Sequence, residues 1–259
     1  MSDRRGVGPT MIGGGMGLTG LIIVVAFTLL SGGDITDVLS QVDTTQVVPT
    51  QSYNSADFEG ADDYEVFAGT VLGSTDETWS QIFSDSGEDY PEPELVLFRG
   101  STASACGGAS SASGPHYCSL DETIYLDETF FEELQKLGTD GGDVAEAYVI
   151  AHEVGHHVQH QLGLLEQVND NESSIKLELQ ADCFAGLWAY SIRDLGVFEP
   201  GEINEAIDAA AAVGDDRIQT TVTGRVNPES WTHGSSADRV AWFNTGYASG
   251  SVAACDTGL

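Results

Sequence analysis

The pattern His-Glu-x-x-His at His152, Glu153 and His156 constrains this 259-residue sequence more than any other feature. It lies in a segment whose apolar residues recur at helical spacing, and residues four apart on a helix share one face. The two imidazoles can therefore reach one ion, and a catalytic zinc has three protein ligands and an open position for water. Glu153, on the neighbouring edge of the helix, is placed to accept a proton from that water.

A second predicted helix carries the carboxylates Glu178 and Asp182, four residues apart on one face. The rest of this helix is too apolar for a surface position, and a buried carboxylate needs a partner because an unpaired buried charge is costly. We expect zinc to be the partner of Glu178 and a ligand imidazole to be the partner of Asp182. The alternative is that both carboxylates face water, as most Glu and Asp do.

A third candidate segment, residues 232–240, contains His233 and Arg239. Both side chains could donate hydrogen bonds to the oxyanion that forms when water attacks a peptide carbonyl. The alternatives are a structural histidine and an arginine paired with acidic groups at the surface. His116, His157 and His160 are predicted to be structural or exposed.

Together these residues resemble the gluzincin peptidases, in which His-Glu-x-x-His is followed by a Glu ligand and, four residues later, by an Asp that holds a ligand. The chain is more closely similar to the family of neutral zinc metallopeptidases that includes YpfJ-type proteins, over roughly residues 70–259. Segment 232–239 is also similar to the Thr-His-Pro-x-x-x-x-Arg segment of HtpX-like peptidases, with Gly234 in place of Pro. The resemblance to YpfJ-type proteins depends on these segments: 79–83, 95–98, 106–107, 114–118, 124–127, 148–159, 178–186, 214–217, 232–239 and 254–256.

The resemblance implies an α+β fold, a mostly helical zincin-like metallopeptidase domain with a small sheet. Hydrophobic patterning predicts the same class, since helical periods outnumber short buried strands. The predicted helices are 63–72, 76–84, 128–137, the two ligand helices, 202–213 and a last one capped by Ser235 or Ser236. The predicted strands are 95–98 and 123–126, with a loop at 100–115.

The N-terminal region is predicted to anchor the chain. Residues 11–30 are uncharged and long enough to cross a bilayer, and Arg4 and Arg5 precede them. Positive charge before a span keeps the N-terminus cytoplasmic. We therefore expect a cytoplasmic segment 1–10, a transmembrane helix 11–30, a flexible linker 31–61 and an extracytoplasmic domain 62–259. A cleaved signal peptide is the rival interpretation.

Four cysteines allow three pairings. An extracytoplasmic domain permits disulfides, and Cys106 with Cys118 closes a short loop, which leaves Cys183 with Cys255. The alternative is buried free thiols, especially at Cys183.

The formal net charge is -32, from 41 acidic and 9 basic residues. This balance excludes nucleic acid as a partner, because nucleic-acid binding needs a basic surface. Solubility at high salt, and hence a halophilic source, is our hypothesis; weak calcium sites are the alternative.

We therefore expect a membrane-anchored, zinc-dependent endopeptidase that acts on peptides or proteins. His152, His156 and Glu178 bind one zinc ion, Asp182 orients a ligand, and Glu153 acts as general base with His233 and Arg239 at the oxyanion. The alternative is an envelope protein that binds zinc without turnover and acts in binding or assembly.

Overall fold

The computed structural model describes residues 1–5, 62–110, 114–131, 135, 139, 142–199 and 201–259. The chain divides into two units, one of Met1–Asp62 and Glu94–Phe130 and the other of Asp63–Pro93 and Phe131–Leu259. Described helices dominate and a small sheet accompanies them, so the predicted α+β class is confirmed.

The first unit is built on a sheet with the strand order β1-β2-β6-β5 among the described residues. Its two best buried strands are β2 (Glu94–Phe98) and β6 (Thr123–Asp127), which pair in parallel with Val96 opposite Tyr125. Both contain the apolar runs that predicted strands there. The outer strands are β1 (Ser2–Asp3), parallel to β2, and β5 (His116–Cys118), antiparallel to β6.

A hairpin of β3 (Ser101–Ser104) and β4 (Gly107–Ser110) occupies part of the stretch predicted to be a loop. Hydrophobic patterning did not predict this hairpin, because its residues are small and few of its side chains are apolar. A disulfide joins Cys106, at the hairpin turn, to Cys118 at the end of β5. The predicted short-loop pairing is thereby confirmed.

The position of β1 corrects the predicted localisation. Ser2 and Asp3 pair with Val96 and Leu97, and the Arg4 amide donates to the Leu97 carbonyl at 2.7 Å. Hydrogen-bonded strands lie on the same side of any membrane, so residues 1–5 and the sheet are not on opposite sides. In the part of the chain that the structure describes, no helix has the length and hydrophobicity that a bilayer span needs.

The prediction of a single-pass membrane protein with its N-terminus inside and its domain outside is therefore wrong. The predicted anchor 11–30 and linker 31–61 lie outside the described residues.

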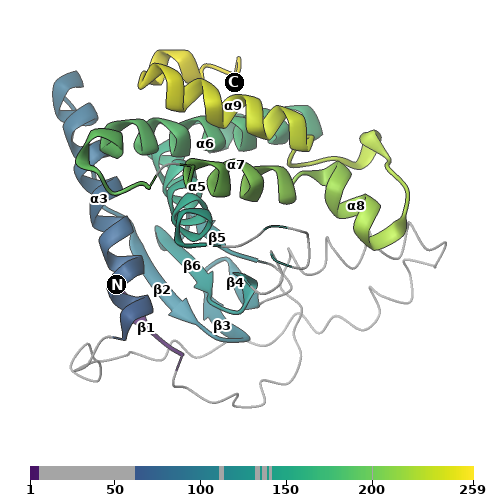
Figure 1. Ribbon diagram of the computed structural model, residues 1–259, viewed down its shortest axis with the longest axis horizontal. Helices are drawn as coiled ribbons and strands as arrows, with labels where there is room; N and C mark the ends of the chain where they lie inside the picture. Colours follow the sequence, from purple (N-terminus) through teal and green to yellow (C-terminus); the bar gives the residue numbers. More distant parts are fainter. Residues whose placement is uncertain (6–61, 111–113, 132–134, 136–138, 140–141, 200) are drawn as a thin grey trace. The chain divides into compact units, whose positions relative to one another are not determined.

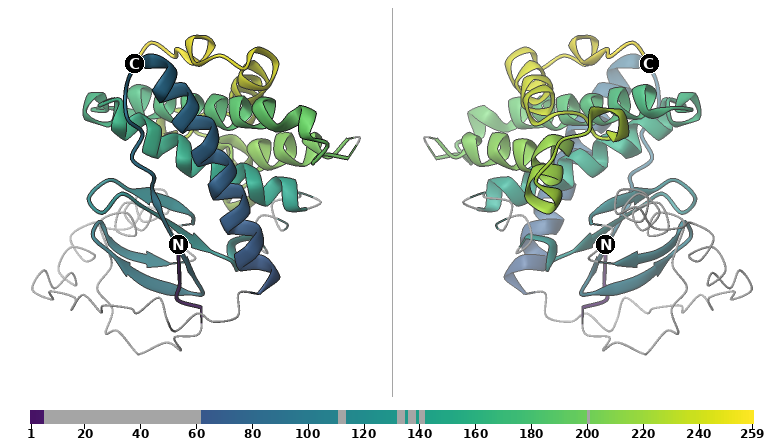
Figure 2. Two further views of the ribbon diagram at one scale, coloured as in Figure 1. Left: turned by 90° about the vertical axis from the view of Figure 1, so that its left-hand side faces the viewer. Right: turned by 90° about the vertical axis from the view of Figure 1, so that its right-hand side faces the viewer.

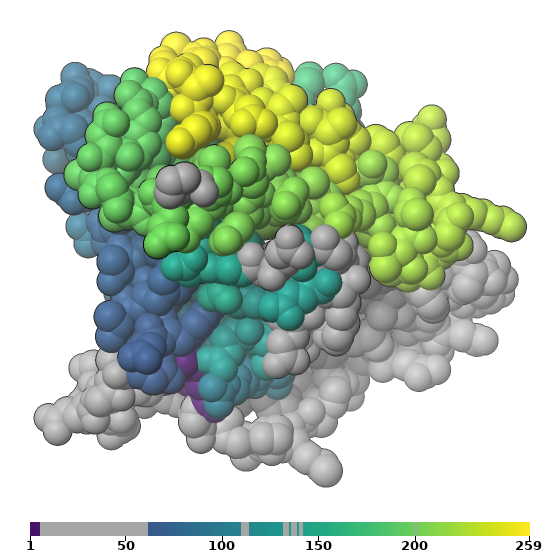
Figure 3. Space-filling model, in the orientation of Figure 1, coloured from purple at the N-terminus to yellow at the C-terminus, as the bar shows by residue number. Residues whose placement is uncertain are grey.

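The second unit is helical (Figures 1 and 2). Figure 2 shows α3 running diagonally across the other helices, and α3 contacts both α5 and α6. Helices α7 and α9 lie side by side on the face seen in Figure 3, and α8 lies beyond the end of α7. The α-helices described here are α3 (Asp63–Ser86), α5 (Asp143–Gln161), α6 (Asn171–Ile192), α7 (Ile203–Ala212), α8 (Asp215–Thr223) and α9 (Ser236–Ser249). Short 3-10 turns are η2 (Leu165–Gln167), η3 (Arg193–Leu195), η4 (Pro228–Ser230) and η5 (Val252–Cys255).

Glycines allow the central helices to approach closely. A Cβ atom at Gly155 of α5 would lie 3.1 Å from the Ala181 Cα of α6, and one at Gly246 of α9 would lie 1.9 Å from the Cys183 carbonyl oxygen. Close approach of these backbones brings side chains of α5, α6 and α9 within reach of one another. A second disulfide, Cys183 to Cys255, fastens η5 to α6 as predicted.

The predicted helices 63–72 and 76–84 form one continuous helix, α3. Gly73 does not interrupt it, because the buried side chains of Leu72, Thr75 and Trp79 continue a single face into the core. Trp79 there packs edge-on against Phe184 of α6, with 5.0 Å between ring centroids. Most of the predicted helix 128–137 lies outside the described residues.

Candidate metal centre

Helix α5 presents the His-Glu-x-x-His residues. It begins at Asp143 after Gly142, whose φ of 122° favours glycine, and Gly163 with a φ of 70° follows its end. His152 and Glu153 are buried, with 7% and 6% of their surfaces exposed. The rings of His152 and His156 are 4.8 Å apart and nearly perpendicular, so both imidazoles occupy one face of the helix.

Helix α6 presents Glu178 and Asp182. Its N-cap is Asp170: the Asp170 carboxylate accepts from the Ser173 amide, and the Ser173 hydroxyl oxygen accepts from the Asp170 amide. This capping box satisfies amide donors at the start of the helix. From Leu179 to Ala189 the helix is buried, and Asp182 has no exposed surface. The expectation of a buried helix that carries carboxylates is therefore confirmed.

Two imidazoles and one carboxylate converge. The Nε2 atoms of His152 and His156 lie 3.3 and 3.5 Å from the two oxygens of Glu178. Two ligand atoms at zinc-ligand distances from a tetrahedral ion are about 3.3 Å apart. One ligand atom from each of these three residues lies within 4.8 Å of the others, so the group could hold a metal ion. Its nitrogen and oxygen donors are those of a three-ligand zinc site.

Charged and hydroxyl groups surround His152. Its Nδ1–H donates to Asp182 Oδ1 at 2.9 Å, which leaves Nε2 directed at Glu178. The Asp182 carboxylate also accepts from the Tyr148 hydroxyl at 2.6 Å and, through both oxygens, from Arg239 at 2.8 and 2.9 Å. Arg239 is 3% exposed, and its Nη2 lies 3.4 Å from both His152 nitrogens.

This network keeps Asp182 ionised. Burial alone would raise the pKa of the Asp182 carboxyl, but the positive charges of Arg239 and His152 and their hydrogen bonds hold it below its ordinary value. Burial would likewise raise the pKa of Glu178, and the neighbouring His156 and His233 lower it well below its ordinary range. Both acids are thus anionic at neutral pH, as a metal ligand and its supporting group need to be.

An amide supports His156 instead of a charge. Its Nδ1 lies 2.9 Å from Gln159 Oε1, three residues further along α5. A ring that donates through Nδ1 keeps its Nε2 lone pair for a metal. Both ligand histidines therefore use the same nitrogen toward Glu178, although their supporting groups differ.

Glu153 directly follows the ligand His152 on α5. Its Oε2 is buried and has no hydrogen-bond partner among the described residues. A buried carboxylate oxygen that lacks a donor is costly, so an unpaired one needs an explanation. A water at the metal position would supply the missing donor, which adds a second observation that fits a metal site with an open position.

Asp215, at the start of α8, holds His233. Asp215 Oδ2 accepts the amides of Thr232, His233 and Gly234 at 2.8, 2.7 and 3.0 Å, and Oδ1 lies 3.3 Å from His233 Nδ1. The His233 side chain is 50% exposed. Burial lowers the pKa of His233, but the negative charges of Glu178 and Asp215 outweigh this and raise it, so the protonated ring is favoured.

Two of the remaining histidines, His157 and His116, have structural contacts. His157 is fully buried, and its Nε2 donates to the Pro91 carbonyl at 2.6 Å. His116 stacks on Tyr125 beside the Cys106–Cys118 disulfide.

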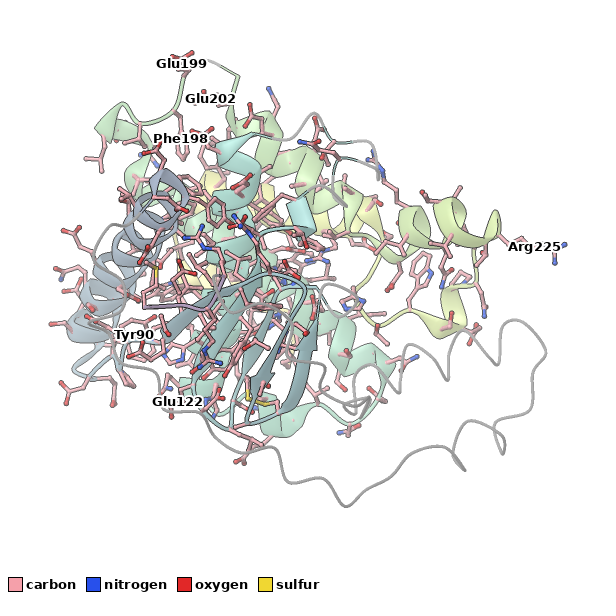
Figure 4. The ribbon with its side chains drawn as sticks, turned by 90° about the horizontal axis from the view of Figure 1, so that it is seen from below. Tyr90, Glu122, Phe198, Glu199, Glu202 and Arg225 are labelled. Atoms are coloured by element: carbon pink, nitrogen blue, oxygen red, sulfur yellow. A yellow bond between two sulfur atoms is a disulfide. The ribbon has the colours of Figure 1, made fainter. Side chains whose placement is uncertain are left out.

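A separate apolar pocket of about 480 Å³ opens elsewhere on the helical unit. Its walls include Phe67, Val71, Trp188 and Phe198, and none of the predicted site residues lines it. Figure 4 shows Phe198 beside Glu199 and Glu202.

Three supporting residues were missed by the sequence analysis: Tyr148, Gln159 and Asp215. Tyr148 lies one helical turn before His152, and Gln159 lies three residues after His156, so helical spacing places both next to the ligands. Spacing alone does not distinguish them from ordinary core residues. Asp215 lies 18 residues before His233, and no local pattern links the two.

Comparison with known proteins agrees with this geometry. The family described as "Putative neutral zinc metallopeptidase" matches residues 1–258. The chain belongs to this family. YpfJ of Escherichia coli strain K12 is 42% identical over 99% of this chain and 94% of its own length. Rv2575 of Mycobacterium tuberculosis strain H37Rv is 44% identical over 71% of this chain and 67% of its own.

No solved structure matches the chain. The resemblance to neutral zinc metallopeptidases inferred from sequence segments is confirmed, and it extends over the whole chain rather than from residue 70 onward. Membership of a zinc metallopeptidase family suggests zinc as the ion for His152, His156 and Glu178.

Proposed function

We propose that this protein is a zinc-dependent endopeptidase. The observation that carries the proposal is the convergence of two imidazoles and a carboxylate at zinc-ligand spacing. Glu153, which directly follows His152, has a buried Oε2 without a hydrogen-bond partner among the described residues. The family assignment supports the same activity. Zinc held by His152, His156 and Glu178 would supply Lewis acidity toward a scissile carbonyl and make a water molecule more acidic.

Glu153 acts as the general base. Its Oε2 accepts a proton from the attacking water and then delivers that proton to the amine that leaves. Because Glu153 is 6% exposed and its Oε2 has no hydrogen-bond partner among the described residues, bulk water competes little for this oxygen, which is available for the transfer.

His233 donates to the carbonyl oxygen as negative charge develops there. Its half-exposed ring can meet a substrate, and the Asp215 carboxylate fixes the loop from which it projects. Glu178 and Asp215 raise the pKa of His233, and the contribution of Asp215 remains when Glu178 binds a metal; protonation lets the ring donate through both nitrogens.

Arg239 positions Asp182 in this proposal, in place of the predicted contact with the oxyanion. Its guanidinium is almost fully buried, and its shortest hydrogen bonds go to Asp182. Asp182 in turn holds His152 Nδ1, so Arg239 acts on the metal through two side chains.

The decisive experiment substitutes Glu153→Gln, with Glu166→Gln as the matched control at an exposed site. We expect wild-type protein to contain zinc and to cleave an unfolded protein such as casein, and a chelator to stop cleavage. Glu153→Gln should keep zinc but lower kcat/KM by roughly 10²- to 10⁴-fold, the contribution of general acid-base catalysis.

Equal cleavage by wild type and Glu153→Gln would exclude the proposed base. Zinc binding by a wild type that hydrolyses no peptide would favour the alternative, a zinc-binding protein without turnover.

A further inference from the structure

A continuous chain of amide groups extends from His156 to the C-terminal disulfide. Gln159 Nε2 donates to the Leu177 carbonyl at 2.7 Å and to Gln180 Oε1 at 3.1 Å. Gln180 Nε2 donates to the Cys255 carbonyl at 3.0 Å. We call His156, Gln159, Gln180 and the two carbonyls the amide relay.

The two carbonyls fix every orientation in the amide relay. A backbone carbonyl only accepts hydrogen bonds, so the nitrogen of each glutamine amide has to face its carbonyl. Both N–H groups of the Gln159 amide are then used, and its oxygen faces His156 Nδ1. An acceptor at that position requires a proton on Nδ1. The amide relay thereby determines which imidazole nitrogen keeps its lone pair.

Burial protects the amide relay from water. Gln159 is fully buried and Gln180 is 7% exposed, so bulk water competes little for these hydrogen bonds. The relay also joins the ligand helices, since Leu177 of α6 directly precedes the ligand Glu178.

The Cys183–Cys255 disulfide holds the far end. Cys183 follows Gln180 by three residues on α6, so both lie on the side of that helix toward η5. The disulfide fastens Cys255, which is itself fully buried, where its carbonyl receives the Gln180 amide.

We infer that Gln159 is a positioning residue for the metal ligand His156, and that the C-terminal disulfide contributes to metal affinity through Gln180 and Gln159. This inference rests on the proposed zinc site but not on peptide hydrolysis. Groups that hold a metal-bound histidine commonly change metal affinity about 10- to 100-fold when they are removed.

The first test measures the zinc dissociation constant of the full chain by competition with a chromogenic chelator. Gln159→Met keeps the length of the side chain but removes its hydrogen bonds, and we expect about 10- to 100-fold weaker binding. Gln161→Met is the matched control on the same helix and should bind zinc as the wild type does.

The second test needs no metal. Nitrogen-15 NMR of the metal-free protein at alkaline pH reports which ring nitrogen of His156 is protonated. We expect Nδ1–H in the wild type and a mixture of tautomers in Gln159→Met. Unchanged tautomer and unchanged zinc affinity in Gln159→Met would overturn the positioning role.

The disulfide has its own matched pair. Cys183→Ala/Cys255→Ala should weaken zinc binding several-fold, whereas Cys106→Ala/Cys118→Ala should leave it unchanged, because that bridge lies in the sheet unit. Gln180→Met breaks the same connection with the disulfide intact, so it tests the link even if a double variant fails to fold. It should also weaken zinc binding several-fold. Wild-type affinity in Gln180→Met would overturn the link to the C-terminus.

Failure of the proposed function gives a different result. A wild type that binds no zinc contradicts the zinc site, while the NMR tautomer still decides whether the amide relay orients His156.

Discussion

The two histidines of the metal centre receive different support. Buried charge holds His152, where Asp182 accepts its Nδ1–H and Arg239 and Tyr148 hold Asp182. Neutral amides hold His156 through Gln159. Both arrangements direct Nε2 at Glu178, so ligand orientation does not require one particular chemistry. What differs is the stability lost when a supporting group is removed, because an uncompensated buried charge costs more free energy than an unpaired buried amide.

The largest effect predicted from this comparison concerns stability. Asp182→Ala leaves the Arg239 guanidinium buried without its main partner, and we expect unfolding free energy to fall by about 3–5 kcal/mol. Gln159→Met leaves neutral groups unpaired and should cost about 1–3 kcal/mol. Urea unfolding of the metal-free variants measures both losses.

Asp194→Ala is the control for the first variant, since Asp194 is exposed on η3 and should change stability by only a few tenths of a kcal/mol. A loss at Gln159 as large as that at Asp182 would remove the distinction between charged and neutral support.

A smaller effect is expected at Asp76, a buried carboxylate of α3 that accepts a long hydrogen bond, 3.5 Å, from the Tyr90 hydroxyl. Burial and the nearby Glu92 raise the pKa of Asp76 to about 7. Asp76 therefore shows how a buried acid behaves when, among the described residues, no cation forms an ion pair with it, in contrast to Asp182 beside Arg239.

The sign of the pH dependence follows from that shift. The folded protein retains the Asp76 proton up to about pH 7, whereas the unfolded chain releases it near 3.8, so stability falls as pH rises between these values. Asp76→Asn lacks this fall, and the margin by which its melting temperature exceeds that of the wild type should grow from about pH 4 to about pH 7 and then level off. A difference that stays constant with pH would contradict the prediction.

The smallest effect is expected from the salt concentration, which changes the repulsion among surface charges but hardly affects the buried ion pair of Asp182 and Arg239. The net charge of -32 means that acidic groups on the surface repel one another. The distance over which this repulsion acts, the Debye length, is about 3 Å in 1 M salt but about 30 Å in 0.01 M salt. Melting temperature should therefore fall on desalting, as the hypothesis of a halophilic source requires. The stability lost in Asp182→Ala should be similar at both salt concentrations, because its ion pair is buried. A melting temperature indifferent to salt would refute the screening hypothesis.

Local pattern predicted much of the centre. Spacing by four residues placed His152 with His156 and Glu178 with Asp182, and the apolar character of α6 predicted that its carboxylates are buried. Short apolar runs predicted β2 and β6. The predicted localisation failed because charge and hydropathy of residues 1–30 do not reveal that Ser2 and Asp3 pair with β2.

The sequence by itself determined which residues can bind a metal, since helical spacing is a local property of the chain. Only the tertiary structure decided what supports each ligand. Arg239 lies 57 residues from Asp182, and the Cys255 carbonyl lies 75 residues from Gln180. Such pairs form because α5, α6 and α9 pack closely at Gly155 and Gly246, and close packing depends on the whole fold rather than on any local pattern.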